Sequence, residues 1–345
     1  MEELIAHYRE SLSGHALFRL ESQSSRLLGG DRLVLASPVF LNREADRIRG
    51  ELAALGIPGK IEFHCAVASH KVQANLHGYP EVKNIIAVAS GKGGVGKSTV
   101  AVNLALALQA QGAAVGLLDA DLYGPSQTRM LGGAQRPASP DQKRMQPIVR
   151  HGLQSISMGD LLRDDDSAVV WRGPLVSQTL LQLLRETLWS GLDFLIVDLP
   201  PGTGDAQLTL AQQIPLAGAV IVSTPQEIAL LDARKAKTMF DKVAIPVLGL
   251  VENMSYHVCS QCQHREYIFD RDGGKALAER YGVPLLGQLP LDIRIREQVD
   301  SGRPSVIAEP DGAIARTFEQ MAFRLMAELA QRPLAPGPKI VVEEP

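Results

Sequence analysis

Residues 84–99 read NIIAVASGKGGVGKST. The first seven of them form a continuous apolar segment, which predicts a buried β-strand. The next segment, GKGGVGKS at 91–98, fits the pattern G-x-x-x-x-G-K-[ST], and residues 98–111 have the composition of a helix that ends at Gly112. A strand, a glycine-rich loop and a helix in this order predict a phosphate-binding loop at the carboxyl end of a parallel strand.

The chemistry of phosphate binding accounts for each residue type in this loop. Glycines let backbone N–H groups surround phosphate oxygens without a Cβ in the way, and the helix N-terminus adds the positive end of its dipole. We expect Lys97 to reach the β- and γ-phosphates of ATP and the Ser98 hydroxyl to bind Mg²⁺. The predicted nucleotide-binding residues of the loop are Gly91, Lys92, Gly93, Gly94, Val95, Gly96, Lys97, Ser98 and Thr99.

The segments around the loop predict an α/β fold with a doubly wound, mainly parallel sheet. Further apolar strands are expected at 114–119, 194–198, 217–223 and 246–251, with helix-length segments between them. Upstream, a smaller strand–helix–strand unit is expected at 31–40, 42–55 and 60–68. The predicted organisation is a small N-terminal α+β module at 1–80, a larger domain at 81–331 that contains the phosphate-binding loop, and a flexible tail at 332–345.

Acidic side chains follow two of the predicted strands. Asp119 and Asp121 stand two residues apart after one strand, so both side chains are expected to point the same way. Asp198 ends the apolar segment FLIVD and precedes the loop LPPGTGD, where an aspartate serves the Mg²⁺ shell. Asp205, at the end of that loop, either belongs to the site or caps the helix that follows.

Composition and charge exclude several classes of partner. The chain has 345 residues, 45% of them hydrophobic, and a net charge of −3, so it gives no reason to expect a nucleic-acid or membrane surface. The sequence has neither an apolar run of ~18–20 residues nor a secretory signal pattern. The three cysteines, Cys65, Cys259 and Cys262, are too few for a disulfide framework. We therefore expect a cytoplasmic protein.

The pair Cys259 and Cys262 lies between His257 and His264, and three kinds of site fit this spacing. A redox dithiol would stand at the start of a helix in a thioredoxin-like unit, a context that is missing here. A Cys₂His₂ zinc site is chemically possible, but its ligands would span only eight residues. The third possibility is an iron–sulfur cluster shared by two chains, because a [4Fe–4S] cluster needs four thiolates and a two-fold axis supplies this pair twice.

The second lysine of the loop, Lys92, is not required by an ordinary phosphate-binding loop. The segment GKGGVGKST resembles the deviant Walker A motif of the MinD/ParA group of dimeric ATPases. The resemblance implies that Lys92 crosses a dimer interface to the partner's nucleotide, that Asp121 positions water, and that Asn253 contacts adenine. The predicted catalytic residues are thus Lys92, Lys97 and Asp121, and hydrolysis is expected to be slow because no other base is apparent.

Five segments together resemble the Mrp/ApbC family of iron–sulfur cluster carriers, over about residues 80–330. They are GKGGVGKST, LLDADLYGPS (117–126), WRGP (171–174), DLPPGTGD (198–205) and VENMS (251–255), the last followed by Cys-x-x-Cys. The resemblance implies a homodimer with a [4Fe–4S] cluster on Cys259 and Cys262 of both chains. It also implies cluster scaffold proteins and apo iron–sulfur clients as partners. The alternative is a positioning or regulatory ATPase of the MinD/ParA kind with a structural zinc ion or no metal.

The first 80 residues depart from this family's pattern. Many members carry an Asp-Pro-Glu motif there, which this chain lacks, so no functional residue is assigned in the N-terminal module. Cys65 falls in the second expected strand of that module, at 60–68, and is interpreted as a buried apolar residue rather than a ligand.

Overall fold

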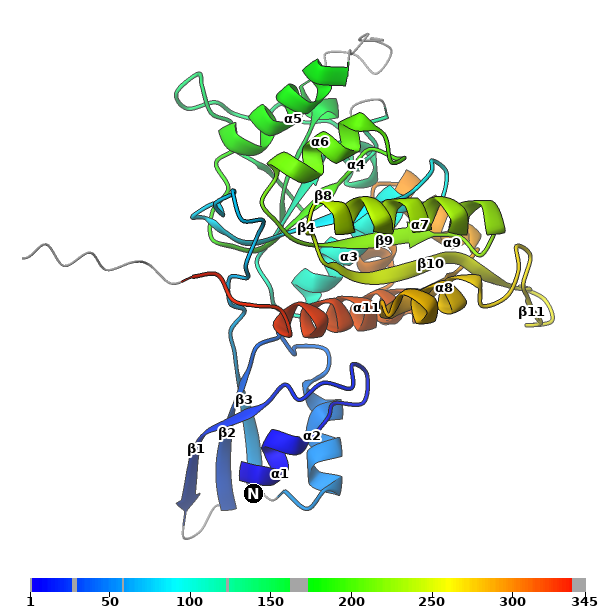
Figure 1. Ribbon diagram of the computed structural model, residues 1–345. Coiled ribbons are helices and arrows are strands. Elements are labelled where there is room, and N and C mark those ends of the chain that lie inside the picture. The colour runs from blue at the N-terminus through cyan, green and yellow to red at the C-terminus, as the bar shows by residue number, and fades with distance from the viewer. Residues whose placement is uncertain (1, 27–29, 58, 122–123, 162–172, 337–345) are drawn as a thin grey trace, which may run out of the picture.

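The computed structural model describes residues 2–26, 30–57, 59–121, 124–161 and 173–336. Two β-sheets organise these residues (Figure 1). The larger sheet has nine strands in the described part of the chain, in the order β11-β10-β9-β4-β8-β5-β7-β6, with β12 also paired to β10. Their bounds are β4 Val82–Ala89, β5 Val115–Asp119, β6 Ile148–Arg150, β7 Leu153–Ser157, β8 Leu192–Asp198, β9 Leu216–Ser223, β10 Val247–Val258, β11 Arg265–Glu266 and β12 Leu285–Pro290.

The centre of this sheet is parallel. Strand β4 pairs in parallel with β8 and β9, β5 with β7 and β8, and β10 with β9 and β12. The antiparallel pairs are β6 with β7 and β10 with β11. The predicted fold class is confirmed, because continuous apolar strands such as β5, β8 and β9 are buried along their whole length.

Two hydrophobic cores lie on opposite faces of the sheet, since successive side chains of a strand point to opposite sides. On β4, Ile86 and Val88 belong to one core, while Ile85 and Ala87 belong to the other. The first core includes α3 (Lys97–Ala110) and α11 (Ala313–Ala330), with α9 (Ile293–Asp300) and the short α10 (Ser305–Ala308). The second includes α5 (Gly173–Glu186), α6 (Asp205–Gln213), α7 (Glu227–Lys242) and α8 (Gly273–Tyr281).

The N-terminal residues form the smaller sheet, β1 (Arg19–Arg26), β2 (Gly30–Ser37) and β3 (Lys60–Cys65), with helices α1 (Glu2–His7) and α2 (Ala45–Ala54). The expected strand–helix–strand is present as β2, α2 and β3; α1 and β1 were not predicted. Apolar side chains of this unit join the same core as α3 and α11. An ion pair between Arg43 Nε and Glu319 Oε1, 2.9 Å apart, also links the unit to α11.

Three expectations are corrected by the structure. The strand expected at 246–251 continues to Val258, because β10 pairs with β12 and then with β11 beyond the end of β9. The tail does not leave the fold at residue 332: Pro333 O accepts from Lys71 N at 2.8 Å, and Ala335 N donates to Ser69 O at 2.9 Å. Cys65 is half-buried and ends β3.

Trp171 of the WRGP segment lies outside the described residues, as does the rest of the expected tail from residue 337.

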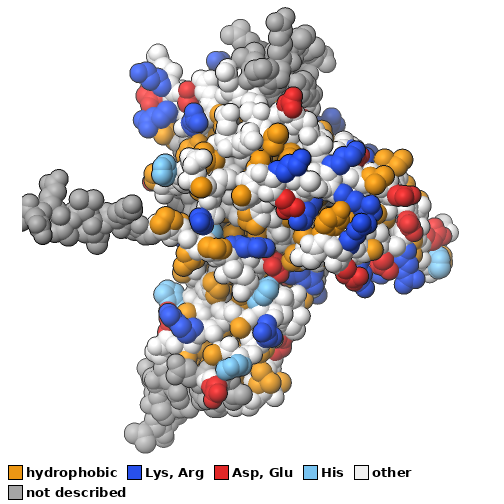
Figure 2. Space-filling view, viewed as in Figure 1, with side chains coloured by type: hydrophobic (Ala, Val, Ile, Leu, Met, Phe, Trp, Pro, Cys, Tyr) orange, Lys and Arg blue, Asp and Glu red, His pale blue; other side chains and the backbone are white. Residues whose placement is uncertain are grey.

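Among the helices that are described, none has both the length and the apolar character to cross a bilayer. Where β10 and β11 project from the molecule, acidic and basic side chains are interspersed on the face seen in Figure 2.

Candidate nucleotide and metal-binding site

The phosphate-binding loop joins the carboxyl end of β4 to the first turn of α3, as predicted. Gly94 and Gly96 both have φ of +80°, a backbone conformation that side chains other than glycine rarely adopt. A Cβ on Gly96 would also lie 2.2 Å from Nδ2 of Asn253. The loop therefore needs glycine at these two positions to keep its backbone conformation and its close approach to Asn253.

Lys97 lies buried at the start of α3, beside the carboxylate that ends β8. Its ammonium group forms an ion pair with Oδ1 of Asp198, whose side chain is fully buried, and lies 3.2 Å from the Ser98 hydroxyl. Lys97 and Asp198 are thus brought together although 101 positions separate them in the sequence. A cation, a carboxylate and a hydroxyl at one point fit the ends of a triphosphate and its Mg²⁺ ion.

The side chains of Asp119 and Asp121 lie in different surroundings, one in the protein interior and the other in a pocket. Asp119 is 1% exposed and accepts hydrogen bonds from the Ser157 hydroxyl at 3.0 Å and from the Gln127 backbone N–H at 3.1 Å. Burial, with the neighbouring charge of Asp198, raises the pKa of Asp119 to about 7. Asp121 instead lines an open pocket together with the phosphate-binding loop. The role of Asp121 in positioning water stays a prediction.

Gln127, the first residue of α4 (Gln127–Met130), was missed by the sequence analysis. Its Nε2 donates to Oδ2 of Asp198 at 2.8 Å and to the backbone oxygen of Ser98 at 3.0 Å. Its position one residue after LLDADLYGPS was the only sequence signal, and an isolated glutamine there does not reveal that its side chain reaches the end of β8.

Lys92 lies in the same pocket, at some distance from the buried ion pair. Its Nζ is 3.4 Å from Oε1 of Gln226, the residue before α7, and its backbone oxygen accepts from the Ser90 hydroxyl at 2.8 Å. No ion pair of Lys92 with a described residue is found. Lys92 is half-buried, and its side chain extends to the residue that precedes α7.

Asn253 is buried within β10, because this strand continues beyond residue 251, where it was expected to end. Its Nδ2 donates to Val95 O of the phosphate-binding loop at 2.9 Å. The amide therefore braces the loop in this structure, and its contact with adenine stays a prediction. Asn253 also lies on the same strand that leads to the cysteine pair.

Cys259 and Cys262 lie at the tip of the hairpin formed by β10 and β11. The hairpin closes with hydrogen bonds from Cys259 N to His264 O and from Gln263 N to Cys259 O, both 2.9 Å. The last pairing of β10 with β9 is at Glu252, so residues 253–258 carry the tip beyond the edge of the parallel sheet. Because β4 and β10 run in the same direction, this is the edge that also bears the phosphate-binding loop (Figure 1).

The described side chains of the hairpin are not arranged as a Cys₂His₂ site. His257 Nδ1 lies 3.0 Å from Leu291 O, so this ring is turned to the base of the hairpin. In the part of the chain that the structure describes, no three His, Cys, Asp or Glu side chains are arranged to hold a metal ion. Among the residues that the structure describes, the cysteine pair therefore has no third side chain arranged with it as a ligand.

The surroundings of Cys259 favour its thiolate form. The backbone N–H groups of Cys262 and Gln261, and the Cys262 thiol, hydrogen-bond to the Cys259 sulfur and lower the pKa of Cys259. Burial raises the pKa of Cys65, on the small sheet. A thiolate is the form that binds iron or zinc, so Cys259 suits a metal ligand and Cys65 does not.

This contrast predicts a difference in reactivity between the two thiols of the cluster-free protein. Cys259 should be alkylated by iodoacetamide faster than Cys65 at pH 7, because a lowered pKa means that more thiolate is present at that pH. The midpoint of its rate–pH profile should lie below that of Cys65. Mass spectrometry of variants that retain one cysteine measures both profiles, and coincident midpoints would contradict the expectation.

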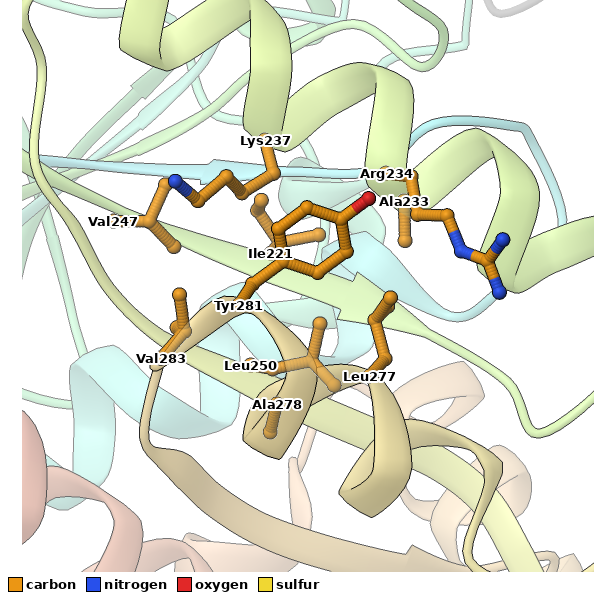
Figure 3. A pocket seen from close by; sticks show the side chains of 10 residues that line it. All are labelled: Ile221, Ala233, Arg234, Lys237, Val247, Leu250, Leu277, Ala278, Tyr281 and Val283. Carbon is orange, nitrogen blue, oxygen red and sulfur yellow. The ribbon is translucent and has the colours of Figure 1, made fainter.

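A second depression lies between α7 and α8 and has a different character. Apolar side chains such as Leu250, Leu277 and Val283 line it, with the Tyr281 ring below the Lys237 side chain (Figure 3). None of the predicted nucleotide or metal ligands belongs to its lining. We interpret it as the seam between two packed helices.

Residues 81–326 match the family model described as ParA, NUBPL iron-transfer P-loop NTPase. The chain belongs to this family. The resemblance seen in the five sequence segments is thereby confirmed. An iron–sulfur cluster carrier protein of Haemophilus influenzae is 58% identical over 338 residues, covering 95% of this chain and 91% of that protein. An iron–sulfur cluster transfer protein of Dictyostelium discoideum, NUBPL, is 45% identical over 272 residues, covering 78% of this chain and 84% of that protein.

Solved structures support the same fold. A nucleotide-binding protein of Archaeoglobus fulgidus in complex with ADP is 38% identical and has a TM-score of 0.58, covering 67% of this chain and 90% of the other. The cell-division ATPase MinD of Pyrococcus furiosus is 24% identical, has a TM-score of 0.53 and covers 70% of this chain and 98% of its own. At that identity, the likeness to MinD concerns the fold alone.

Proposed function

We propose that this protein is an ATP-binding, slowly ATP-hydrolysing carrier of iron–sulfur clusters in the cytoplasm. Two chains hold one [4Fe–4S] cluster on their Cys259 and Cys262 thiolates and pass it to apo iron–sulfur proteins. The observation that carries the proposal is the cysteine hairpin. It presents two thiols at its tip, has no further protein ligand nearby within the described chain, and projects from the sheet edge that bears the phosphate-binding loop.

The arrangement suits a cargo that is held and then released. A centre with two ligands from each chain and an exposed Cys262 is accessible to an acceptor, unlike a centre enclosed within one chain. Names of relatives at 58% and 45% identity point to the same cargo. Dimerisation is inferred from the count of thiolates, since a [4Fe–4S] cluster takes four.

The residues of the nucleotide site have separable tasks in this proposal. The backbone N–H groups of the loop and the N-terminus of α3 bind the phosphates, and Lys97 neutralises charge on them. The Ser98 hydroxyl and Asp198 would hold a Mg²⁺ ion, which would supply further neutralisation of the phosphate charge. Asp121 orients the attacking water, and Lys92 reaches the nucleotide of the other chain.

Anaerobic reconstitution with iron and sulfide tests the cluster. We expect about four irons and four sulfides per dimer in the wild type, and neither in the variant Cys259→Ala/Cys262→Ala. Cys65→Ala is the matched control, because Cys65 lies on the small sheet and should leave the iron content unchanged. Iron, zinc, sulfide and the oligomeric state are measured on the same samples.

Two outcomes would contradict the carrier function. Stoichiometric zinc without sulfide would indicate a structural metal, and a dimer without metal would leave an ATPase whose cargo is another protein. A cluster that survives loss of both hairpin cysteines would show that the thiolates come from elsewhere.

A further inference from the structure

Gln127 joins three chain segments that converge on the nucleotide site. Its backbone N–H donates to Oδ2 of Asp119 at 3.1 Å, at the end of β5. Its side-chain Nε2 donates to Oδ2 of Asp198 at 2.8 Å, at the end of β8, and to the backbone oxygen of Ser98 at 3.0 Å, in the first turn of α3. Only 2% of the residue is exposed. Gln127 therefore fixes the positions of Ser98 and Asp198, the predicted Mg²⁺-binding residues, relative to each other.

The orientation of the Gln127 amide follows from its two side-chain partners. A carboxylate oxygen of Asp198 and the carbonyl oxygen of Ser98 are both acceptors, so the amide nitrogen must face them. Both hydrogens of Nε2 are then in use. The amide oxygen, Oε1, is left as an acceptor, and it is buried without a hydrogen-bond partner among the described residues.

A buried acceptor without a partner is unfavourable unless something else donates to it. The Asp198 carboxylate is not a donor, since its two oxygens accept from Lys97 and from Gln127 itself. A Mg²⁺ ion at a phosphate site keeps several of its waters, and each bound water is a strong donor. Groups that orient such a shell fix the geometry of metal binding without touching the metal.

We propose that Gln127 is a positioning residue for the Mg²⁺–nucleotide complex. Its Nε2 keeps the Asp198 carboxylate in place, and its Oε1 accepts a hydrogen bond from a water on the metal. The inference rests on the proposed ATP site. In addition, it assigns to Gln127 an effect on the binding of the metal-bound nucleotide and not on the binding of the nucleotide alone.

Metal-dependent nucleotide binding tests the inference. Gln127→Met keeps the approximate volume of the side chain and removes both the donor and the acceptor, and Gln127→Asn keeps the amide but shortens its reach. Equilibrium binding of fluorescent ADP is measured with excess Mg²⁺ and with EDTA, and Mn²⁺ binding to the ADP complex is measured by electron paramagnetic resonance. We expect both variants to bind ADP in EDTA within about 2-fold of wild type, and to bind Mn²⁺ about 10-fold or more weakly.

The matched control is Gln111→Met. Gln111 is also fully buried, but it follows the C-terminal end of α3, about 20 Å from the loop, where it bonds to Glu319 O at 3.4 Å. This variant should keep wild-type affinity for Mn²⁺. If either folded Gln127 variant keeps wild-type metal affinity, or loses ADP affinity equally with and without metal, the positioning role is wrong. If the wild type itself binds no ADP, the proposed ATP site fails instead.

Discussion

Replacing Lys92 with alanine should lower ATP hydrolysis by about 10³-fold and leave ATP binding within about 3-fold of wild type. Lys92 lines the pocket with its ammonium group 3.4 Å from Oε1 of Gln226, whereas Lys97 forms the buried ion pair with Asp198. If it completes the site of the other chain, its loss removes transition-state stabilisation and not the phosphate cradle. Single-turnover hydrolysis and equilibrium binding separate the two effects.

Mixing two inactive variants distinguishes action across the dimer from action within one chain. Lys97→Ala removes the lysine of the phosphate cradle, and Lys92→Ala removes the lysine that is proposed to cross. In a mixed dimer, the Lys92→Ala chain keeps its own Lys97 and receives Lys92 from its partner, so one of the two sites is complete. An equal mixture should regain about a quarter of wild-type activity, because half of the dimers are mixed and half of their sites are complete.

The control for this experiment is Lys60→Ala, at an exposed lysine of β3 on the small sheet, which should hydrolyse ATP at the wild-type rate. Absence of any recovery from the mixture, in samples shown to contain mixed dimers, would place the action of Lys92 within its own chain.

Loss of a buried ion pair should lower the stability of the fold. Arg150, at the end of β6, pairs with Asp160 in the short 3-10 helix Met158–Asp160. The side chain of Arg150 is 3% exposed and that of Asp160 is 0% exposed. Arg150 also donates to the Ser155 hydroxyl at 2.9 Å and to Gly133 O at 3.1 Å. Arg150→Met would leave the Asp160 charge buried without its partner. We expect the free energy of unfolding to fall by about 3–5 kcal/mol.

Chemical denaturation measures this change, and two further variants interpret it. Arg296→Met removes an exposed arginine that pairs with Asp300 on α9, so its cost should stay below about 1 kcal/mol. Arg150→Met/Asp160→Leu removes both charges and should recover most of the lost stability, because the penalty arises from one unpaired buried charge. A loss of less than about 1 kcal/mol in Arg150→Met would show that water or another group compensates Asp160.

The same ion pair bears on the nucleotide site. The backbone N–H of Ser157 donates to Asp160 at 3.1 Å, and the Ser157 hydroxyl donates to Asp119 at 3.0 Å. Loss of Arg150 is therefore expected to disturb the segment that supports Asp119, although Arg150 itself is not among the residues that line the pocket.

The sequence by itself determined the elements whose signals are local. A strand, a glycine loop and a helix predicted the phosphate-binding loop, because its glycines, lysine and serine are contiguous. Continuous apolar segments predicted the parallel strands, because a strand with helices packed on both faces of its sheet has apolar side chains on both sides. The Cys-x-x-Cys spacing likewise predicted two convergent thiols.

The tertiary structure decided what depends on contacts between distant segments. The side chain of Asn253 reaches Val95 O in the phosphate-binding loop, a contact across 158 positions of the sequence that the sequence analysis did not predict. The tail expected from residue 332 is held as far as Ala335 by pairing with residues 69–71, a contact that composition does not encode.

The contacts of Gln127 could not be predicted from the neighbouring sequence. Its role comes from partners 29 and 71 positions away, Ser98 and Asp198, which meet only because β4, β5 and β8 lie together in the sheet. The sequence could identify the chemistry of a contiguous loop. Only the folded sheet could bring a single glutamine to the carboxylate that ends another strand. A hydrogen bond requires its donor and acceptor atoms to lie within about 3 Å of each other, and the spacing of residues along the chain does not set that distance.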